Sequence, residues 1–257
     1  MKQIIDIHAH AFPDKVAEKA IPALESEAVI KARSVGKIQS LLASMDGAGV
    51  QTAVVASIAT KPEQFRSILD WSGALRSERL LPFPSIHPED PDAALHLDEI
   101  AAAGFKGIKL HPYYQRFIID DEKMFPIYEQ CSAAGLIILF HTGFDIAFPF
   151  DRIADPVKAL RVWETFPELK MISSHFGGWK DWEESEKYLL GKPVYMDISA
   201  SLEFMPEEQA RRFLMQHPAE YILFGSDSPW DDQRELLGRL YRFQLPESRL
   251  DALLYEN

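Results

Sequence analysis

Short apolar runs alternate with helical patterns along the whole chain. Eight runs rich in Val, Ile and Leu have the length of strands, at residues 3–8, 51–57, 80–86, 105–110, 136–141, 169–174, 193–198 and 221–225. Most are continuously apolar, which is typical of parallel strands covered on both faces. Between them, apolar residues recur at helical spacing over residues 37–49, 62–75, 91–104, 121–135, 154–167, 182–190 and 206–218. Proline near the starts and glycine or proline beyond the ends mark the helix limits.

This alternation predicts an α/β fold with a parallel sheet. Eight strands in one unbroken progression indicate a closed (β/α)8 TIM barrel. No linker, repeat or low-complexity segment interrupts the pattern, and barrels often have about this length. We therefore expect one domain that spans residues 1–257.

Two connections are longer than the others. Residues 11–36 contain a short helical piece, AEKAIPALESEAV, and residues 142–155 carry Phe144, Phe148 and Phe150. Long loops in a compact barrel are usually lids or binding loops. A hydrophobic plug over the barrel end and a subunit contact remain alternatives.

Residues suited to bind a metal stand at the ends of several apolar runs. The first run, IIDIHAH, finishes on His8 and His10. Residues two apart on a strand point to the same side, so these imidazoles converge. Later runs end on His141, His175 and Asp227. Imidazole and carboxylate groups are the ligands of catalytic zinc, and active sites of barrels lie at the carboxyl ends of the strands.

Each of these residues also has a plainer interpretation. His8 or His10 alone would be a structural histidine, and His141 a histidine bonded to a carbonyl at the edge of the core. A ligand and a general base look alike in sequence at His175. Asp227 precedes Pro229 and would suit a helix N-cap. The recurrence at separate strand ends favours the metal site.

Lys109 ends the fourth run in GFKGIKLHP and is followed by His111. A lysine at the end of a buried run is costly unless it pairs or reacts. Three roles are open for it: binding of a substrate oxygen, carbamylation that bridges two metals, or pairing with Asp227 or Asp197. We expect an unmodified amine beside one metal ion, and we expect His111 and Trp230 to contact the substrate as well.

Other polar residues have smaller expected roles. Asp6 shares a strand face with His8 and His10 and is expected to orient an imidazole. His96 and His217 lie in helical patterns, so we expect them to be surface or packing residues. Cys131 is the only cysteine, which rules out an intrachain disulfide, and its helical setting favours a small buried residue.

Charge narrows the range of partners. With 27 Lys and Arg against 39 Asp and Glu, the net charge is −12, which argues against nucleic acid and anionic membranes. No apolar stretch approaches 18 residues and no basic leader precedes the first strand. The sequence predicts a cytoplasmic protein that acts on a small molecule.

Five motifs together resemble a known superfamily. DIHAH, GIKLHP, HTG, SHFGG and GSDSPW follow one another between residues 6 and 230. In this order they resemble the amidohydrolase-related branch of the amidohydrolase superfamily, which includes aminocarboxymuconate semialdehyde decarboxylase and resorcylate-type decarboxylases. Decarboxylases of the branch are usually longer, with extended loops, and commonly continue past the position of Asn257.

The resemblance implies a divalent metal, usually zinc and sometimes manganese. Its ligands would be His8, His10, His141 and Asp227, and His175 would act on the metal-bound water or on the substrate. The branch also implies a homodimer.

The leading functional expectation is metal-assisted hydrolysis of an amide, cyclic amide, lactone or ester. Asp227 or His175 would be the base, and Lys109 or His175 would stabilise the oxyanion. The alternative is non-oxidative decarboxylation of an aromatic or unsaturated acid. In that reaction aromatic side chains would face a planar substrate and a cation would bind its carboxylate, and the candidates are Phe144, Phe148, Trp179 and Trp230, with Lys109, Arg116 or Arg152.

A structural metal site or a ligand sensor is disfavoured. Structural zinc sites are usually closed and rich in cysteine, and the expected ligands include no cysteine.

Overall fold

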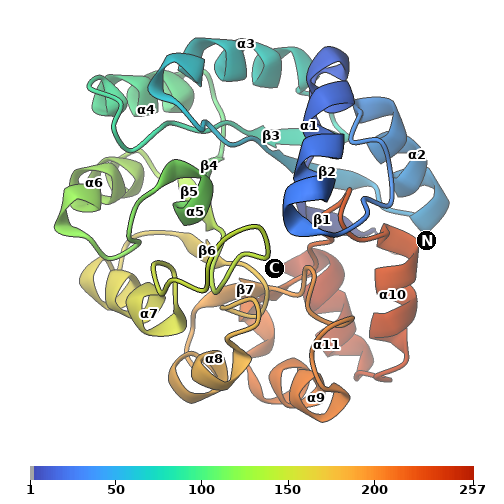
Figure 1. Ribbon diagram of the computed structural model, residues 1–257. Coiled ribbons are helices and arrows are strands. Elements are labelled where there is room, and N and C mark those ends of the chain that lie inside the picture. The colour runs from blue at the N-terminus through green and yellow to red at the C-terminus, as the bar shows by residue number, and fades with distance from the viewer. Residues whose placement is uncertain (1–2) are drawn as a thin grey trace.

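Eight parallel strands surround one axis, and helices form the outer ring (Figure 1). The computed structural model describes residues 3–257. The strands are β1 Ile5–Ala9, β2 Thr52–Ala56, β3 Leu80–Phe83, β4 Gly107–Leu110, β5 Ile137–Phe140, β6 Met171–Ser173, β7 Tyr195–Asp197 and β8 Ile222–Leu223. Each lies within one of the predicted runs, apart from Ala9 at the end of β1.

Helices connect the strands at the predicted places. They are α1 Asp14–Ala28, α2 Ile38–Ala48, α3 Phe65–Leu75, α4 Ala93–Ala102, α5 Pro112–Gln115, α6 Phe125–Ala133, α7 Pro156–Thr165, α8 Trp182–Tyr188, α9 Glu207–Gln216, α10 Gln233–Tyr241 and α11 Glu247–Asp251. Short turns of helix are η1 Pro62–Gln64, η2 Glu122–Met124, η3 Ala219–Tyr221 and η4 Ala252–Glu256. The sequence pattern did not identify α5 or the helices after residue 230.

The barrel closes at two seams. One sheet has the order β1-β2-β3 and the other the order β4-β5-β6-β7-β8. Between β3 and β4, the Lys109 amide donates to the Pro84 carbonyl at 2.9 Å. Between β8 and β1, the Asp227 amide donates to the His8 carbonyl at 2.7 Å. The predicted TIM barrel is therefore confirmed.

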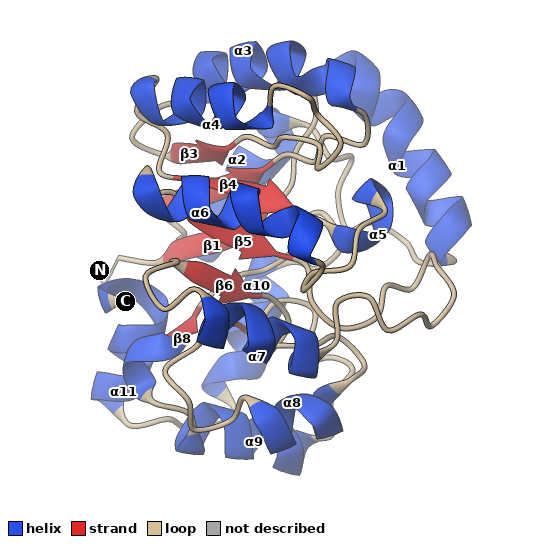
Figure 2. Ribbon diagram, turned by 90° about the vertical axis from the view of Figure 1, so that its left-hand side faces the viewer, coloured by secondary structure: helices blue, strands red, loops and turns tan. Residues whose placement is uncertain are grey.

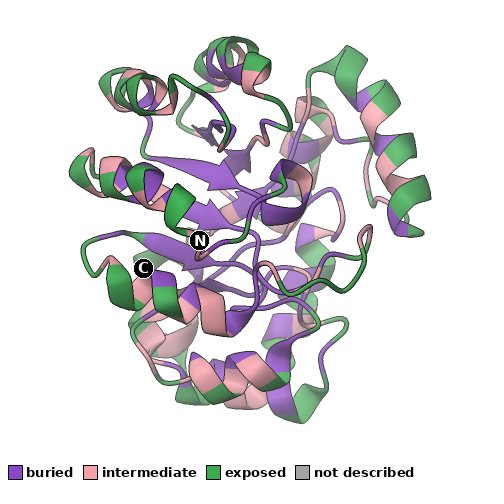
Figure 3. Ribbon diagram, turned by 60° about the vertical axis from the view of Figure 1, so that its left-hand side comes forward, coloured by how far each residue is buried: buried purple, intermediate pink, exposed green. Residues whose placement is uncertain are grey.

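The strands are buried on both faces, as their continuous apolar pattern predicted (Figure 3). Phe83, Leu139 and Ile172 belong to a cluster that fills the barrel interior. A Cβ atom at Gly107 would lie 2.5 Å from the Phe83 ring and from the Ile137 carbonyl oxygen. A glycine is needed there because the interior of a small barrel is packed solid.

The helix α1 lies apart from the outer ring. Figure 2 shows it at the end of the barrel toward which the strands point. It is longer than the helical piece expected within residues 11–36, and Pro22 is part of it. None of the helices in residues 3–257 combines the length and the apolar character needed to cross a membrane.

Candidate metal centre

The strand ends meet at a cavity of about 650 Å³. The residues predicted as metal ligands, as the base or as substrate contacts of the hydrolase line it: His8, His10, Lys109, His111, His141, His175, Asp227 and Trp230. His8 and Lys109 lie in β1 and β4, and the others lie in the segments that directly follow β1, β4, β5, β6 and β8. The barrel thus brings together residues that lie far apart in sequence.

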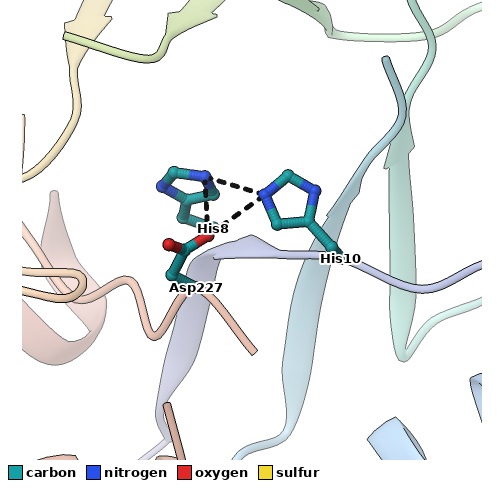
Figure 4. Close-up of side chains that lie close together, drawn as sticks. All are labelled: His8, His10 and Asp227. Carbon is teal, nitrogen blue, oxygen red and sulfur yellow. Dashed lines mark hydrogen bonds and ion pairs between the residues drawn. The ribbon is translucent and has the colours of Figure 1, made fainter. Parts of the chain in front are cut away.

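His8, His10 and Asp227 form the tightest group (Figure 4). The two Nε2 atoms are 3.2 Å apart, and Asp227 Oδ1 lies 3.1 Å from that of His10 and 3.5 Å from that of His8. Tetrahedral ligands about 2.0–2.2 Å from a zinc ion are separated by roughly 3.3–3.6 Å. These three atoms therefore have the spacing of ligands around one ion.

The outer nitrogens of both imidazoles fix their tautomers. The Nδ1 of His8 lies 2.9 Å from a carboxylate oxygen of Asp197, and the Nδ1 of His10 lies 2.8 Å from the carbonyl of Ala56. An ionised carboxylate and a carbonyl only accept hydrogen bonds, so each Nδ1 carries the hydrogen. Each Nε2 then presents a lone pair to the other. A cation between them removes this repulsion, and the residues present fit a metal ion.

A second pair of imidazoles repeats this arrangement next to the first. His141 donates from Nε2 to the carbonyl of Phe144 at 3.0 Å, and His175 donates from Nδ1 to the carbonyl of Ser199 at 3.0 Å. The remaining nitrogens, His141 Nδ1 and His175 Nε2, face each other at 3.1 Å. The rings of His8 and His175 have centroids 5.4 Å apart, so the two pairs adjoin.

The position of His141 differs from that of the other expected ligands. Its ligand atoms group with those of His111 and Asp145 rather than with the group of His8. The His111 ring stacks on that of His141 with centroids 4.2 Å apart, and its Nε2 lies 3.4 Å from Asp145. The four-ligand set therefore stays a prediction. Asp145 was not predicted from the sequence, because it lies in a loop without any strand to mark it.

Burial keeps three of these imidazoles neutral. It lowers the pKa of His8 to about 4, with Lys109 adding to the effect and Asp197 opposing it. Burial also lowers the pKa of His111 and His141 well below the usual value. Neutral imidazoles are the form that binds metal ions.

Lys109 is fully buried, and its Nζ lies 3.1 Å from His8 Nε2. Burial lowers the pKa of its amine to about 8, although Asp227 and Asp197 pull it upward. Within residues 3–257 it forms no ion pair with either carboxylate, so the direct pairing considered from the sequence is not seen. The amine is held beside the candidate ligands.

Asp197 takes the role that the sequence suggested for Asp6. It accepts from the His8 ring and, through Oδ1, from the main-chain amide of His175 at 3.0 Å. Burial alone would raise the pKa of Asp197, but the contacts with His8 lower it overall. Asp6 instead accepts from the main-chain amide of His8 and the side chain of Gln233. The expectation that Asp6 orients an imidazole was wrong.

Two candidate residues have a strained backbone. His175 and Asp227 have φ angles of 61° and 62°, in the left-handed region. Such strain costs on the order of 1–3 kcal/mol and collects at functional sites. The Asp227 carboxylate faces His10, and the amide of Trp230 bonds to its main-chain carbonyl at 2.9 Å. The N-cap interpretation of Asp227 is therefore not supported.

Some of the aromatic and basic residues expected to contact a substrate line the cavity, and others are engaged with neighbouring side chains. Trp179 and Trp230 line the cavity. Phe144 packs edge-on against Phe150, and Phe148 packs in the same way against Tyr114, and neither Phe144 nor Phe148 lines the cavity. Arg152 forms ion pairs with Asp155, Asp181 and Glu184, so its guanidinium is already occupied.

Fold and site together define a TIM-barrel enzyme with a candidate metal centre at the carboxyl ends of its strands. The family model described as "Amidohydrolase" matches residues 5–257, and the chain belongs to this family. A search of the curated proteins gave no match.

Solved structures share the fold at low sequence identity. The chain is similar to the TIM-barrel protein Bb4693 of Bordetella bronchiseptica, at 18% identity and a TM-score of 0.78, over 98% of this chain and 95% of that one. It is similar to 5-carboxyvanillate decarboxylase LigW of Sphingomonas paucimobilis, at 14% identity and a TM-score of 0.75, over 99% of this chain and 97% of that one. It is also similar to a dihydroxybenzoic acid decarboxylase of Polaromonas sp. JS666, at 16% identity and a TM-score of 0.72, over 99% of this chain and 95% of that one. The structure of that decarboxylase holds manganese and the inhibitor 2-nitroresorcinol.

Proposed function

We propose that this protein is a metal-dependent hydrolase that cleaves an amide, cyclic amide, lactone or ester with water. One observation carries the proposal: four buried imidazoles direct unprotonated nitrogens toward one another beside the carboxylate of Asp227. His8, His10, His141 and Asp227 would hold a divalent ion, zinc or manganese. When bound, that ion polarises a carbonyl and makes water nucleophilic at neutral pH.

His175 is the better candidate for the base. Its Nε2 carries a lone pair because Nδ1 donates to Ser199, and Asp197 accepts from its main-chain amide. Asp227 Oδ1 lies 3.1 Å from His10 Nε2 and belongs to one of the predicted metal ligands, so the carboxylate would be committed to the ion. His175 Nε2 would take the proton of the attacking water and return it to the leaving oxygen or nitrogen.

Lys109 would stabilise the charge that develops on the carbonyl oxygen. With a pKa of about 8, most of its amine is protonated at neutral pH. A buried ammonium acts more strongly on a developing negative charge than an exposed one, because little water screens it. His111 and Trp230, which also line the cavity, would position the substrate.

Decarboxylation of an aromatic acid is the second candidate. It is favoured by the flat side chains of Trp71, Trp179 and Trp230 in the cavity wall and by Lys109 at its floor. It is also favoured by the similarity to two named decarboxylases. In this reaction Lys109 would hold the carboxylate, and His175 would deliver a proton to the carbon that loses carbon dioxide.

One experiment separates the two reactions. Metal-loaded protein is incubated with a panel of lactones, esters, amides and aromatic acids, and both acid production and carbon dioxide release are measured. Acid production from a neutral substrate that is lost in His175→Asn supports hydrolysis. Carbon dioxide release from an aromatic acid, without hydrolysis of any neutral substrate, refutes it. A homodimer and a cytoplasmic location stay predictions.

A further inference from the structure

One face of α1 forms a wall of the cavity. The residues of α1 that line the space have a spacing that places them along one side of the helix, and they are Val16, Ala20, Ala23, Leu24, Glu27 and Ala28. All but Glu27 are apolar. This side of α1 therefore faces the cavity rather than the core.

A neighbouring stripe of the same helix fixes it to the protein. Ala17 and Ile21 are buried and do not line the cavity. Ile21 packs so closely on the turn at Gly36 that a Cβ atom there would lie 2.6 Å from Ile21 Cδ1. The helix is anchored by this second stripe, which leaves the first stripe free to contact a bound molecule.

The other walls of the cavity are also apolar. Ile58 follows β2, and Ile68 and Trp71 belong to α3. Ile146, Trp179 and Phe204 complete the wall near the second long loop and α8. A cavity of about 650 Å³ has the size of sites that take drug-sized molecules.

The charges of the cavity are distributed unevenly. Among the lining residues that the structure describes, Lys109 is the only lysine or arginine, and it lies at the floor beside His8. Glu203 and Asp231 also line the cavity, and both pair with Arg239, at 3.1 Å and 2.8 Å. The Arg239 guanidinium is thus already committed to carboxylates. A negative group on the distal part of a substrate would have no cation to bind.

We infer that the substrate is an uncharged carbonyl compound with a long apolar body, such as a lactone, ester or amide that carries a medium-length alkyl or arylalkyl chain. This inference rests on the proposed hydrolysis. The carbonyl lies at the imidazoles of the floor, and the chain lies between α1 and α3. The chain covers apolar surface that would otherwise face water.

The first test is a series of γ-lactones from four to twelve carbons, with a matched twelve-carbon lactone that ends in a carboxylate. We expect kcat/KM to rise about two- to fourfold for each methylene group until the cavity is filled. The terminal carboxylate should cancel most of the gain. Equal kcat/KM along the series, or a preference for the carboxylate, would overturn the inference and leave hydrolysis standing.

Two variants locate the alkyl chain of the substrate. Leu24→Glu and Ile68→Glu place a charge in the walls formed by α1 and α3 and should flatten the dependence of kcat/KM on the length of the alkyl chain. The matched control is Val29→Glu, which follows α1, is 90% exposed and is not a lining residue. It should keep the dependence of the wild type. If the dependence of kcat/KM on alkyl chain length is unchanged in both wall variants, the alkyl chain of the substrate lies elsewhere and the inference is contradicted.

A binding experiment separates this inference from the proposed reaction. Alkyl hydroxamic acids of two to ten carbons, which bind metal ions through the hydroxamate, are titrated calorimetrically into the metal-loaded protein. Affinity that rises with chain length and falls in Leu24→Glu supports the apolar substrate even if no lactone is hydrolysed. Affinity that is independent of chain length, or an absence of binding, counts against it.

Discussion

Two regions of this barrel bury histidine equally but use it differently. His217, behind β7, donates from Nε2 to the carbonyl of Val194 at 2.9 Å and accepts at Nδ1 from the amide of Gly191 at 3.3 Å. Both of its nitrogens have complementary partners. At the mouth of the barrel, His10 has one such partner, the carbonyl of Ala56, and its Nε2 instead lies 3.2 Å from His8 Nε2 and 3.1 Å from a carboxylate oxygen of Asp227. Burial alone therefore does not distinguish a structural histidine from a candidate ligand. The distinction is whether the second ring nitrogen has a complementary hydrogen-bond partner.

The largest expected effect comes from His10→Ala. If the nitrogens at the mouth hold a metal ion, this variant should lose turnover on the order of a thousandfold or more and bind less metal. The fold should remain, because the apolar interior holds the barrel. Elemental analysis, turnover and circular dichroism check these three points. Normal metal content together with global unfolding would show that His10 is a structural residue like His217.

The converse variant is His217→Ala. It leaves the Val194 carbonyl and the Gly191 amide unpaired and opens a cavity, so the free energy of unfolding should fall by about 2–4 kcal/mol. Turnover per folded molecule and metal content should match the wild type. Urea unfolding with a parallel metal assay measures both. Loss of metal in this variant would remove the distinction between the two regions.

A smaller effect is expected from Lys109→Met. Its amine contacts His8 but is not one of the predicted ligands, so turnover should fall about 10- to 100-fold with one ion per chain retained. Metal stoichiometry and a crystal structure of the loaded wild type provide the control. Two ions bridged by a carbamate on Lys109 would contradict the single-ion prediction.

The smallest effect concerns pH and stability. Burial lowers the pKa of His217 to about 4 from its ordinary value of 6.5. Between these values the unfolded chain binds more protons than the folded one, so stability falls as the pH drops from about 6.5 toward 4. This residue should contribute roughly 1 kcal/mol to the loss between pH 7.5 and 5.5. The difference between the urea midpoints at these two pH values should be smaller for His217→Gln than for the wild type. The same difference in both proteins would assign the effect to other groups.

The alternation of strands and helices was readable in the sequence because burial on both faces leaves continuous apolar runs. The candidate residues were readable because they end those runs. The role of Asp197 could not be predicted from the sequence, because β7 is brought next to His8 only when the barrel closes. Asp6 was misassigned because its carboxylate is taken up by the main-chain amide of His8 and by the side chains of Ser226 and Gln233, which only the folded barrel brings to it. Asp145 and the cavity-facing side of α1 lie in connections, where no strand period fixes direction.

The seam between β8 and β1 has a consequence for synthesis of the protein. The Asp227 amide bonds to the His8 carbonyl, so candidate ligands that lie far apart in sequence are neighbours across this seam. Asp227 leaves the ribosome roughly 220 residues after His8, which takes about 10–40 s at ordinary rates of translation. During that interval the first two imidazoles are made but their carboxylate partner is not. An ion that needs all three must wait until Asp227 has been made, and its capture then marks a barrel in which the segment after β8 has joined β1.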